Sequence, residues 1–341
     1  WIESFLRDRK QRVVLGDSVS GWCDVTSGVP QGSVLGPLLF TIFINDLPSE
    51  VRNKFLMYAD DGKLITKIDA TEIDNNTMHS DINNIVNWCA KWSMELSPGK
   101  CKIMHFGKDN PKRKYFIPLK SGDILEVSKS ISERDLGVIV EDDCRWSGQV
   151  SSAANKANQI LGRIRNAFSY YTNDLAKVVY PVFVRPHLEF TVPVWNPRRS
   201  CEVKSLEKVQ RRATRTVELI HRPYVERLDK LTASLTIRRR RGDLIQCYKL
   251  VKGMELVNWS YSQAIFNFNL ESRRNPYRLM REKCSNCKQR FDFLLNRVAT
   301  SWNNLPRNVV EAPKLDSFKA RLDVYLKSIK GRTSIYTTGP C

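Results

Sequence analysis

The spacing of hydrophobic and polar positions changes several times along the first 140 residues. An irregular loop rich in glycine and proline, residues 25–37, precedes a stretch that is apolar on nearly all sides and is closed by Pro48. Such a stretch predicts a buried helix rather than a surface helix, with Ser33 as its N-cap. Residues 54–68 predict a β-hairpin with Asp-Asp-Gly at its tip, because aspartate and glycine tolerate tight-turn conformations.

A helical period follows. Apolar residues recur at steps of three and four between residues 71 and 94, which predicts an amphipathic helix with the stripe Met78, Ile82, Ile85, Cys89 and Trp92. Residues 100–107 return to a strand pattern, and more short strands are expected up to about residue 140. The front part therefore predicts the α+β class, with helices packed on a mostly antiparallel sheet.

After Trp146 the apolar positions form helical stripes. One stripe consists of Val150, Ala154, Ala157, Leu161, Ile164 and Phe168, and a second of Val203, Leu206, Val209, Ala213 and Val217. A third helical stretch contains four consecutive arginines, and residues 290–306 predict one more helix that ends in a loop. The patterns divide the chain into an α+β region over residues 1–147, a basic all-α region over residues 148–260 and a C-terminal helical region over residues 261–341.

Charge is distributed unevenly along the chain. The 341 residues carry a net charge of +19, yet residues 1–150 sum to −2 and residues 151–341 to +21. A strongly basic half indicates a polyanionic partner, most often nucleic acid. An acidic membrane surface is the competing partner, which we disfavour because neither terminus carries a lipidation signal or an amphipathic anchor.

The basic residues lie on the polar sides of the three predicted helices. A single charge run is usually a solvated helix face, and that interpretation remains open here. Three separate helices with few balancing acids favour nucleic-acid contact instead. The residues expected to contact the nucleic-acid backbone are Arg211, Arg212, Arg238, Arg239, Arg240 and Arg241.

The nine cysteines are scattered along the chain without the spacing of a disulfide framework. This usage is typical of reduced thiols in the cytosol or nucleus. Cys284 and Cys287 form a lone C-x-x-C, and a zinc site would need two further ligands that the scattered histidines do not supply by their spacing.

Asp60 and Asp61 place two adjacent carboxylates between the apolar runs of the predicted hairpin. Enzymes that transfer phosphoryl groups with two magnesium ions need hard oxygen ligands on a rigid mount, and a hairpin tip supplies one. Bound cations relieve the repulsion between neighbouring acids. The alternative is an ordinary acidic turn, since Asp-Asp-Gly also suits turns.

The context of this acidic pair resembles a known family. "YADD" preceded by "FLM", about thirty residues after "GVPQGSVLGPLLF", resembles the polymerase palm of reverse transcriptases, and of non-LTR retrotransposons of the jockey and chicken-repeat kind in particular. Later segments continue the resemblance: residues 88–107 look like the next palm element, residues 133–143 like the strand pair that grips the primer end, and residues 206–215 and 297–323 like the thumb and the C-terminal region. The resemblance thus implies a partial palm, a thumb and a C-terminal helical region.

The resemblance implies roles for individual residues. Asp60 corresponds to a metal-binding aspartate of the palm, with Asp61 in a supporting role, and Tyr58 to a residue beside the primer end or incoming nucleotide. Gln31 and Gly32 would line the nucleotide and template pocket, where a glycine allows close approach of a base pair. Lys100 would assist departing pyrophosphate, although a solvent-exposed turn lysine is an equal interpretation.

The implied activity is an RNA-directed DNA polymerase that uses Mg²⁺, with RNA template, DNA primer or nicked target, and deoxynucleoside triphosphates as partners. No membrane association is implied, and a ribonucleoprotein of nucleus and cytoplasm is the expected location.

The family's first palm strand, with another metal-binding aspartate, has no counterpart in the 24 residues before Val25. We therefore expect a fragment that does not polymerise alone. Two alternatives stay open: a non-catalytic nucleic-acid-binding remnant of a retroelement, and a group II intron maturase.

Overall fold

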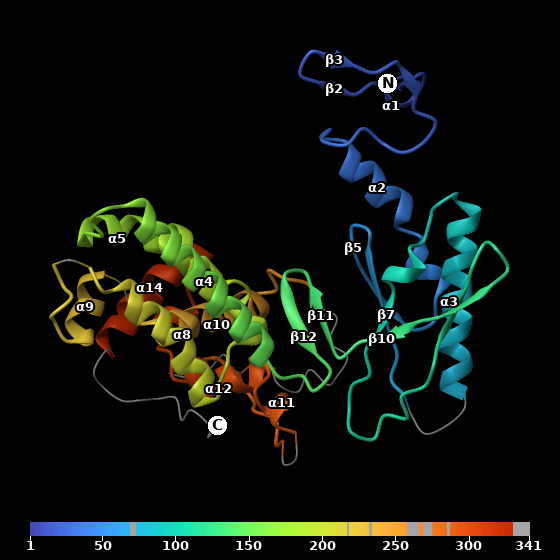
Figure 1. Ribbon diagram of the computed structural model, residues 1–341. Helices are drawn as coiled ribbons and strands as arrows, with labels where there is room; N and C mark the ends of the chain where they lie inside the picture. Colours follow the sequence, from blue (N-terminus) through green and yellow to red (C-terminus); the bar gives the residue numbers. More distant parts are fainter. Residues whose placement is uncertain are drawn as a thin grey trace. The chain divides into compact units, whose positions relative to one another are not determined.

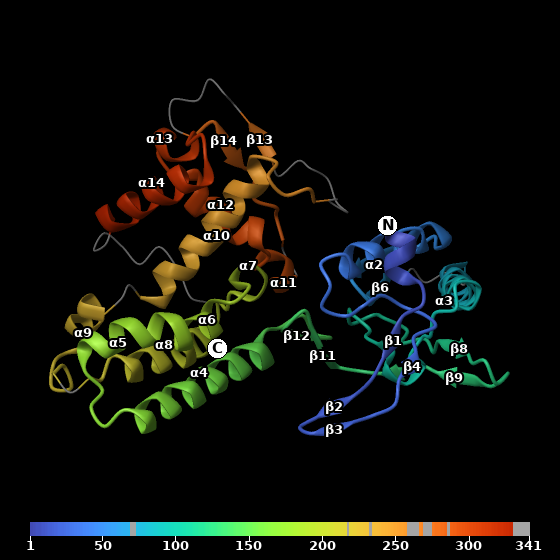
Figure 2. The same cartoon turned by 90° about the horizontal axis from the view of Figure 1, so that it is seen from above.

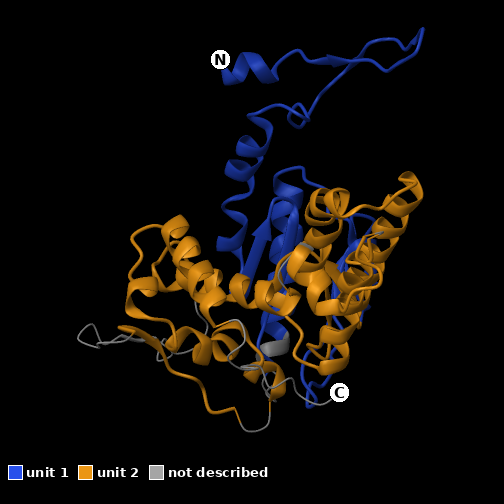
Figure 3. Ribbon diagram, turned by 90° about the vertical axis from the view of Figure 1, so that its left-hand side faces the viewer, with its two compact units in different colours: residues 1–130 blue, residues 131–341 orange. Residues whose placement is uncertain are grey.

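The computed structural model describes residues 1–68, 73–216, 218–231, 234–257, 266–268, 275–284 and 287–329. The chain forms two compact units, residues 1–130 and residues 131–341, which Figure 3 colours blue and orange. The sequence pattern predicts a domain boundary after residue 147. In the structure the boundary follows residue 130, and residues 131–147 cluster with the second unit.

Unit 1 mixes short helices with short strands. Its elements are α1 (Ile2–Leu6), β1 (Lys10–Gln11), β2 (Val14–Leu15), β3 (Ser18–Val19), β4 (Cys23–Asp24), α2 (Gly36–Ile44), η1 (Leu47–Glu50), β5 (Lys54–Tyr58), β6 (Asp61–Ile65), α3 (Ile73–Lys91), η2 (Pro98–Lys100), β7 (Lys102–Ile103), β8 (Phe116–Pro118), β9 (Ile124–Glu126) and β10 (Ser128–Lys129) (Figure 1). The predicted hairpin and the long helix after it are confirmed as β5–β6 and α3. The mixture agrees with the α+β class.

The strands do not join into one sheet. Those in the described ranges pair as separate two-stranded ladders, all antiparallel except β7 with β10, which run parallel. The prediction of one mostly antiparallel sheet is therefore wrong as to its extent. Alternation of apolar residues indicates that a strand exists but does not indicate how many neighbours it pairs with.

The small core of unit 1 lies where α2, α3 and β5 meet. Ile44, Leu47, Trp88 and Cys89 are buried there, and inward-facing residues of the hairpin, Phe55 and Met57, pack against them. Trp88 is 3% exposed, which agrees with core packing, whereas Trp92 one turn later remains 42% exposed.

The helix α2 is shorter and less buried than its sequence predicts. Only Gly36 and Ile44 of this helix are buried, and Leu38 and Ile42 are 55% and 65% exposed. The prediction of a fully buried helix is thus wrong for this structure, because α3 and β5 cover one side of α2 only. The expected cap is present in a modified form: Ser33 Oγ accepts a hydrogen bond from Gly36 N at 3.0 Å, although Leu35 is the N-cap residue.

Unit 2 is mainly helical. Its elements are β11 (Ser132–Asp135), β12 (Val138–Glu141), α4 (Ser147–Ala167), α5 (Asn173–Val179), the π-helix η3 (Tyr180–Val184), α6 (Arg185–Glu189), α7 (Val192–Trp195), α8 (Ser200–Ala213), α9 (Tyr224–Leu231), α10 (Leu235–Val251), β13 (Phe266–Phe268), β14 (Tyr277–Leu279), α11 (Lys288–Phe291), α12 (Leu294–Asn303), α13 (Arg307–Val310) and α14 (Leu315–Ser328) (Figure 2).

The β11–β12 hairpin belongs to unit 2 because it is hydrogen-bonded to the start of α4. Gln149 Oε1 accepts from Ile139 N at 2.9 Å, and Glu141 Oε2 accepts from Gly148 N at 3.0 Å. Val138 joins the hydrophobic core beside α4. These contacts explain why the unit boundary precedes the hairpin.

The first core of unit 2 is built from the predicted stripes. Val150, Ala154, Ala157, Leu161 and Ile164 of α4 are buried, and so are Leu206, Val209 and Ala213 of α8. Both stripes are confirmed at these positions, while Phe168 stays 43% exposed and Val217 lies outside the described residues.

The second core of unit 2 gathers α10, α12, α13 and α14. Tyr248 stacks on Phe318 with ring centroids 4.2 Å apart and donates a hydrogen bond to Ala312 O at 2.6 Å. The indole of Trp302, which is fully buried, donates to Tyr277 O at 2.6 Å. Since α10 contributes Leu235 to the first core and residues 244–248 to the second, one helix links the two.

Of the helices that the structure describes, none combines the length and the apolar character needed to cross a bilayer.

Candidate functional site

The acidic pair lies at the tip of the β5–β6 hairpin. Tyr58 is the last paired residue of β5 and faces Asp61, so Ala59 and Asp60 form the turn. Ala59 has φ of 51°, in the left-handed region, which costs a non-glycine residue about 1–2 kcal/mol. The turn places Asp60 at the apex and Asp61 at the first position of β6.

Local packing explains why glycine follows the acidic pair. Gly62 lies opposite Met57, and a Cβ built on Gly62 would come within 2.7 Å of the ring of Phe55. That ring packs on the buried core of unit 1. A side chain at residue 62 would therefore displace the residue that anchors the hairpin.

Asp81 of α3 fixes the other end of β5. Its carboxylate is fully buried and accepts hydrogen bonds from Arg52 N at 2.9 Å and from Asn53 N and Nδ2 at 2.8 Å each. These bonds hold the start of β5 against α3 and thereby position the strand that ends at Tyr58. The sequence analysis missed Asp81, because its partners are mainly backbone N–H groups 28 and 29 residues away, and no residue spacing indicates such a contact.

The side chains of the tip are open to solvent. Asp60 and Asp61 are exposed, and Tyr58 is 66% exposed. Within the described ranges, no ion pair is made by Asp60 or Asp61, and no group of three or more His, Cys, Asp or Glu side chains could hold a metal ion. The tip thus presents two carboxylates, which are hard oxygen donors of the kind that Mg²⁺ prefers.

The structure joins neither the Gln31–Gly32 loop nor Lys100 to the tip by a hydrogen bond or ion pair, as far as the described residues show. Gly32 has φ of 80° and open space around its missing Cβ, so its backbone conformation is what requires glycine. Lys100 is exposed in the short helix η2. These three residues remain predictions, distinct from the tip in the structure.

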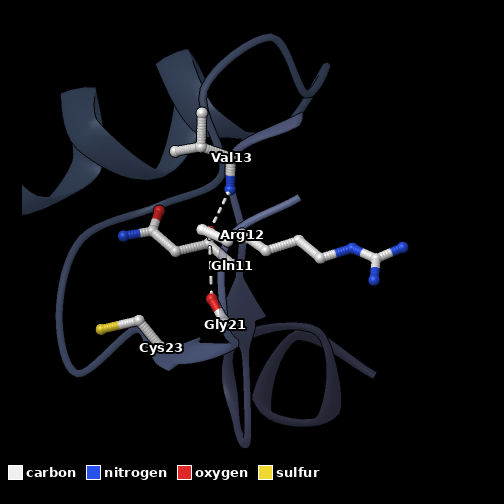
Figure 4. A pocket seen from close by; sticks show the side chains of 6 residues that line it. Gln11, Arg12, Val13, Gly21 and Cys23 are labelled. Carbon is white, nitrogen blue, oxygen red and sulfur yellow. Dashed lines mark hydrogen bonds between the residues drawn. The ribbon is translucent and has the colours of Figure 1, made fainter. Parts of the chain in front are cut away.

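A hollow near the N-terminus contains no acidic residue. Gln11, Arg12, Val13, Ser20, Gly21 and Cys23 line it (Figure 4). Ser20 Oγ accepts from Val13 N at 2.9 Å and donates to Gly21 O at 3.1 Å, which closes the loop between the strands. Without a carboxylate the hollow does not offer a site for a hard cation.

The exposed cations of α8 lie on one face of the helix. Lys204, Lys208 and Arg211 follow each other at four and three residues, which places them in one row on the helix surface. Other exposed cations of α4, of α8 and of the turn after α8 include Lys156, Arg163, Arg212 and Arg215. Among the residues described, no carboxylate forms an ion pair with any of these seven side chains. We refer to these seven residues as the α4–α8 basic face.

Side-chain contacts orient part of this face. Arg212 Nη1 donates to Asn158 Oδ1 of α4 at 3.2 Å, and Arg165 Nη2 donates to Arg212 O at 2.6 Å. The guanidinium of Arg211 stacks over the Tyr224 ring at 4.6 Å. The predicted backbone contacts Arg211 and Arg212 are therefore exposed and held in place.

The four consecutive arginines of α10 differ from this face. Arg238 pairs with Glu189, with Nη2 to Oε2 at 3.0 Å, and Arg241 pairs with Asp323, with Nη2 to Oδ2 at 3.0 Å. Arg239 and Arg240 are only 4% and 8% exposed. The expectation that residues 238–241 form a solvent-facing basic row is wrong, because carboxylates of other elements neutralise two of them and the core covers the other two.

Arg239 illustrates this burial. Its Nη2 donates to Leu188 O at 2.8 Å, and its guanidinium lies 5.0 Å from the centre of the Trp195 ring. Burial lowers the pKa of Arg239 to about 10, and nearby carboxylates oppose that change. Such a side chain stabilises the junction of α6, α7 and α10 rather than offering charge to a ligand.

The C-x-x-C pair shows no metal-site geometry in the described residues. Cys284 Sγ is 3.9 Å from Asn296 Nδ2, and Cys287 is exposed. The two thiols therefore carry no assigned role in the candidate site.

Comparisons with known proteins support the family that the hairpin sequence and its context resemble. The family described as "Reverse transcriptase (RNA-dependent DNA polymerase)" matches residues 1–150. The probable RNA-directed DNA polymerase from transposon BS of Drosophila melanogaster is 24% identical over 63% of this chain and 25% of its own length. The RNA-directed DNA polymerase from mobile element jockey of Drosophila funebris is 26% identical over 63% of this chain and 24% of its own length.

The chain spans about a quarter of the length of these curated relatives. No solved structure gives a significant match. The family match covers β5–β6 with its acidic tip, and the relatives extend the similarity beyond it. Residues 1–150 therefore match the reverse transcriptase family, and the chain is similar over 63% of its length to RNA-directed DNA polymerases of transposons and mobile elements.

Proposed function

We propose that this chain is the palm and thumb part of an RNA-directed DNA polymerase that adds deoxynucleotides to a primer 3′ hydroxyl. In this reaction the hydroxyl oxygen bonds to the α-phosphorus of the incoming nucleotide, and pyrophosphate leaves. The observation that carries the proposal is the exposed, unneutralised acidic pair Asp60–Asp61 on an anchored hairpin. An ordinary surface turn would not need the buried anchoring that Phe55 and Asp81 provide.

In this proposal the residues of unit 1 have different roles. Asp60 and Asp61 would hold Mg²⁺, which when bound neutralises the triphosphate and lowers the pKa of the attacking hydroxyl. Tyr58, exposed beside them, would contact the primer end or the incoming nucleotide. Gln31, Gly32 and Lys100 would contact template, nucleotide and departing pyrophosphate.

The α4–α8 basic face would hold the template–primer duplex. The row from Lys204 to Arg211 extends about 10 Å along the helix axis. One strand of a duplex carries a phosphate about every 3.4 Å of its axis, so the row matches about three phosphates. RNA template, DNA primer or nicked target, and deoxynucleoside triphosphates are the proposed partners, and nucleus and cytoplasm the proposed locations.

Metal binding at the tip provides the direct test. Paramagnetic Mn²⁺ should broaden the amide signals of Ala59 and Asp60 in the full chain, and Asp60→Asn with Asp61→Asn should abolish the broadening. Asp109→Asn, which removes an exposed acid from another turn of unit 1, is the matched control and should leave it intact. Equal broadening in the double variant would contradict the proposed role of the acidic pair.

A further inference from the structure

One arginine of α9 is buried without a counter-charge. Arg227 is 6% exposed, and its Nε is sealed from solvent with no hydrogen-bond partner. No carboxylate of the described residues pairs with it. Glu226, the adjacent acid, pairs instead with Arg222 at 3.2 Å. A buried unpaired guanidinium is costly, so its presence needs an explanation.

Its neighbours increase the positive charge. Burial lowers the pKa of Arg227, and Arg215 and then Arg211 lower it further, while Tyr224 acts in the opposite direction. The Tyr224 ring lies 5.8 Å from the guanidinium of Arg227 and 4.6 Å from that of Arg211. Arg211 and Arg227 therefore share one aromatic ring, whose face compensates their charge only in part, and Arg215 adds a third positive charge beside Arg227.

The Tyr224 ring is itself held in place. Its hydroxyl donates to Glu207 Oε2 at 3.0 Å, and Glu207 Oε1 accepts from Thr236 N at 3.3 Å at the start of α10. The Glu207 carboxylate is thereby engaged in hydrogen bonds with Tyr224 and Thr236. The bond from Tyr224 to Glu207 joins the start of α9 to α8, two helices that Figure 1 labels.

We propose that Arg211, Arg215 and Arg227 form a phosphate-binding site that takes one backbone phosphate of the nucleic-acid duplex. A phosphate oxygen would accept N–H groups of the Arg227 Nη atoms, which are not among the sealed atoms, and its charge would offset the mutual repulsion of the three guanidinium groups. The site deepens the proposed function and rests on it. It would fix the register of the duplex on the α4–α8 basic face, which scattered surface cations do not do.

The test compares Arg227→Met with Arg222→Met in the full chain. Arg222 is exposed and already paired, so its loss is the matched control. Inorganic phosphate, compared with chloride at equal ionic strength, should raise the melting temperature of the wild type and of Arg222→Met but not of Arg227→Met. Affinity for a fluorescent RNA–DNA duplex should fall about tenfold in Arg227→Met and less than twofold in Arg222→Met.

In phosphate-free buffer, Arg227→Met should melt no lower than the wild type, because it removes an uncompensated charge. Arg227→Lys keeps the charge without the planar fork and should lose most of the response to phosphate, which keeps the test valid if the methionine variant does not fold. Equal phosphate shifts and equal duplex affinities in wild type and Arg227→Met would overturn the site.

The measurements with inorganic phosphate and with the RNA–DNA duplex distinguish a free phosphate ligand from a backbone phosphate. A phosphate shift that depends on Arg227, with duplex affinity unchanged, would overturn the backbone assignment and indicate a free phosphate ligand. If the wild type bound no duplex at all, the proposed function would fail, and the phosphate measurement would still decide whether the site exists.

Discussion

Two arginine-rich helices of unit 2, α8 and α10, look alike in sequence and differ in structure. The cations of α8 are exposed and have no acidic partner in the described residues, whereas those of α10 are buried or paired with acids of other elements. The acids that neutralise Arg238 and Arg241 come from 49 and 82 residues away. A run of basic residues therefore indicates a ligand surface only after its long-range partners are known.

Removing the acid of α10 should have the largest effect. Asp243 is fully buried and accepts from Arg297 Nε at 3.0 Å and Nη2 at 2.7 Å. Asp243→Ala leaves Arg297 buried without its carboxylate partner, so the free energy of unfolding should fall by about 3–5 kcal/mol in urea denaturation. Asp316→Ala, at an exposed pair with Lys319, is the control and should change it by less than about 0.5 kcal/mol.

Neutralising α8 should affect binding instead of stability. In Lys204→Gln/Lys208→Gln/Arg211→Gln, affinity for an RNA–DNA duplex should fall about tenfold to a hundredfold, and the slope of log affinity against log salt should decrease by about 2 to 3. The free energy of unfolding should stay within about 0.5 kcal/mol, since these side chains are exposed. An unchanged salt slope would remove the distinction between the two helices.

Removing one paired arginine of α10 should lower stability slightly and leave duplex binding unchanged. Arg241 is 28% exposed and Asp323 is 44% exposed. Arg241→Gln should lower the free energy of unfolding by about 1 kcal/mol or less, because a partly exposed ion pair contributes little. Fluorescence anisotropy should show the same salt dependence of duplex affinity as in the wild type, and a reduced slope would indicate that α10 also contacts nucleic acid.

The smallest expected effect is the change in the pKa of His187, which reports the uncompensated charge of α4. Burial lowers the pKa of His187, and Lys156 lowers it further. As pH falls below the ordinary histidine range, the unfolded chain binds a proton that the folded chain resists, so stability is lost. Lys156→Gln should raise the pKa toward its ordinary value and reduce this loss, as followed by NMR titration.

Lys177→Gln is the control for that titration. Lys177 is paired with Asp174 at 3.0 Å. Its replacement should therefore leave the pKa of His187 unchanged. An equal change in both variants would mean that the net charge of unit 2, rather than the α4–α8 basic face, sets the pKa.

Local patterns predicted the parts of the molecule that depend on local physics. The turn at Asp60 follows from its flanking strands, and the stripes of α4 and α8 follow from helical periodicity. The pairing of Arg238 with Glu189 depends on tertiary structure that no spacing encodes. The exposure of Ile42 likewise could not be predicted, because an all-apolar helix does not indicate which of its sides a neighbour will cover.

The candidate site shows the same division. The residues of the tip were predicted because they are adjacent in sequence, whereas Asp81 and Arg227 were missed. The importance of Asp81 comes from backbone donors 28 and 29 residues away, and that of Arg227 from the absence of a counter-charge in the described residues.

The long helix α10 begins in one hydrophobic core of unit 2 and ends in the other. A helix shared in this way makes the two halves of the unit fold and melt together, since neither can lose its packing without freeing one end of α10. A disturbance of the packing of α12 or α14 would therefore reach α8 through α10. The packing of the C-terminal helices thus also supports the helices that carry the exposed cations.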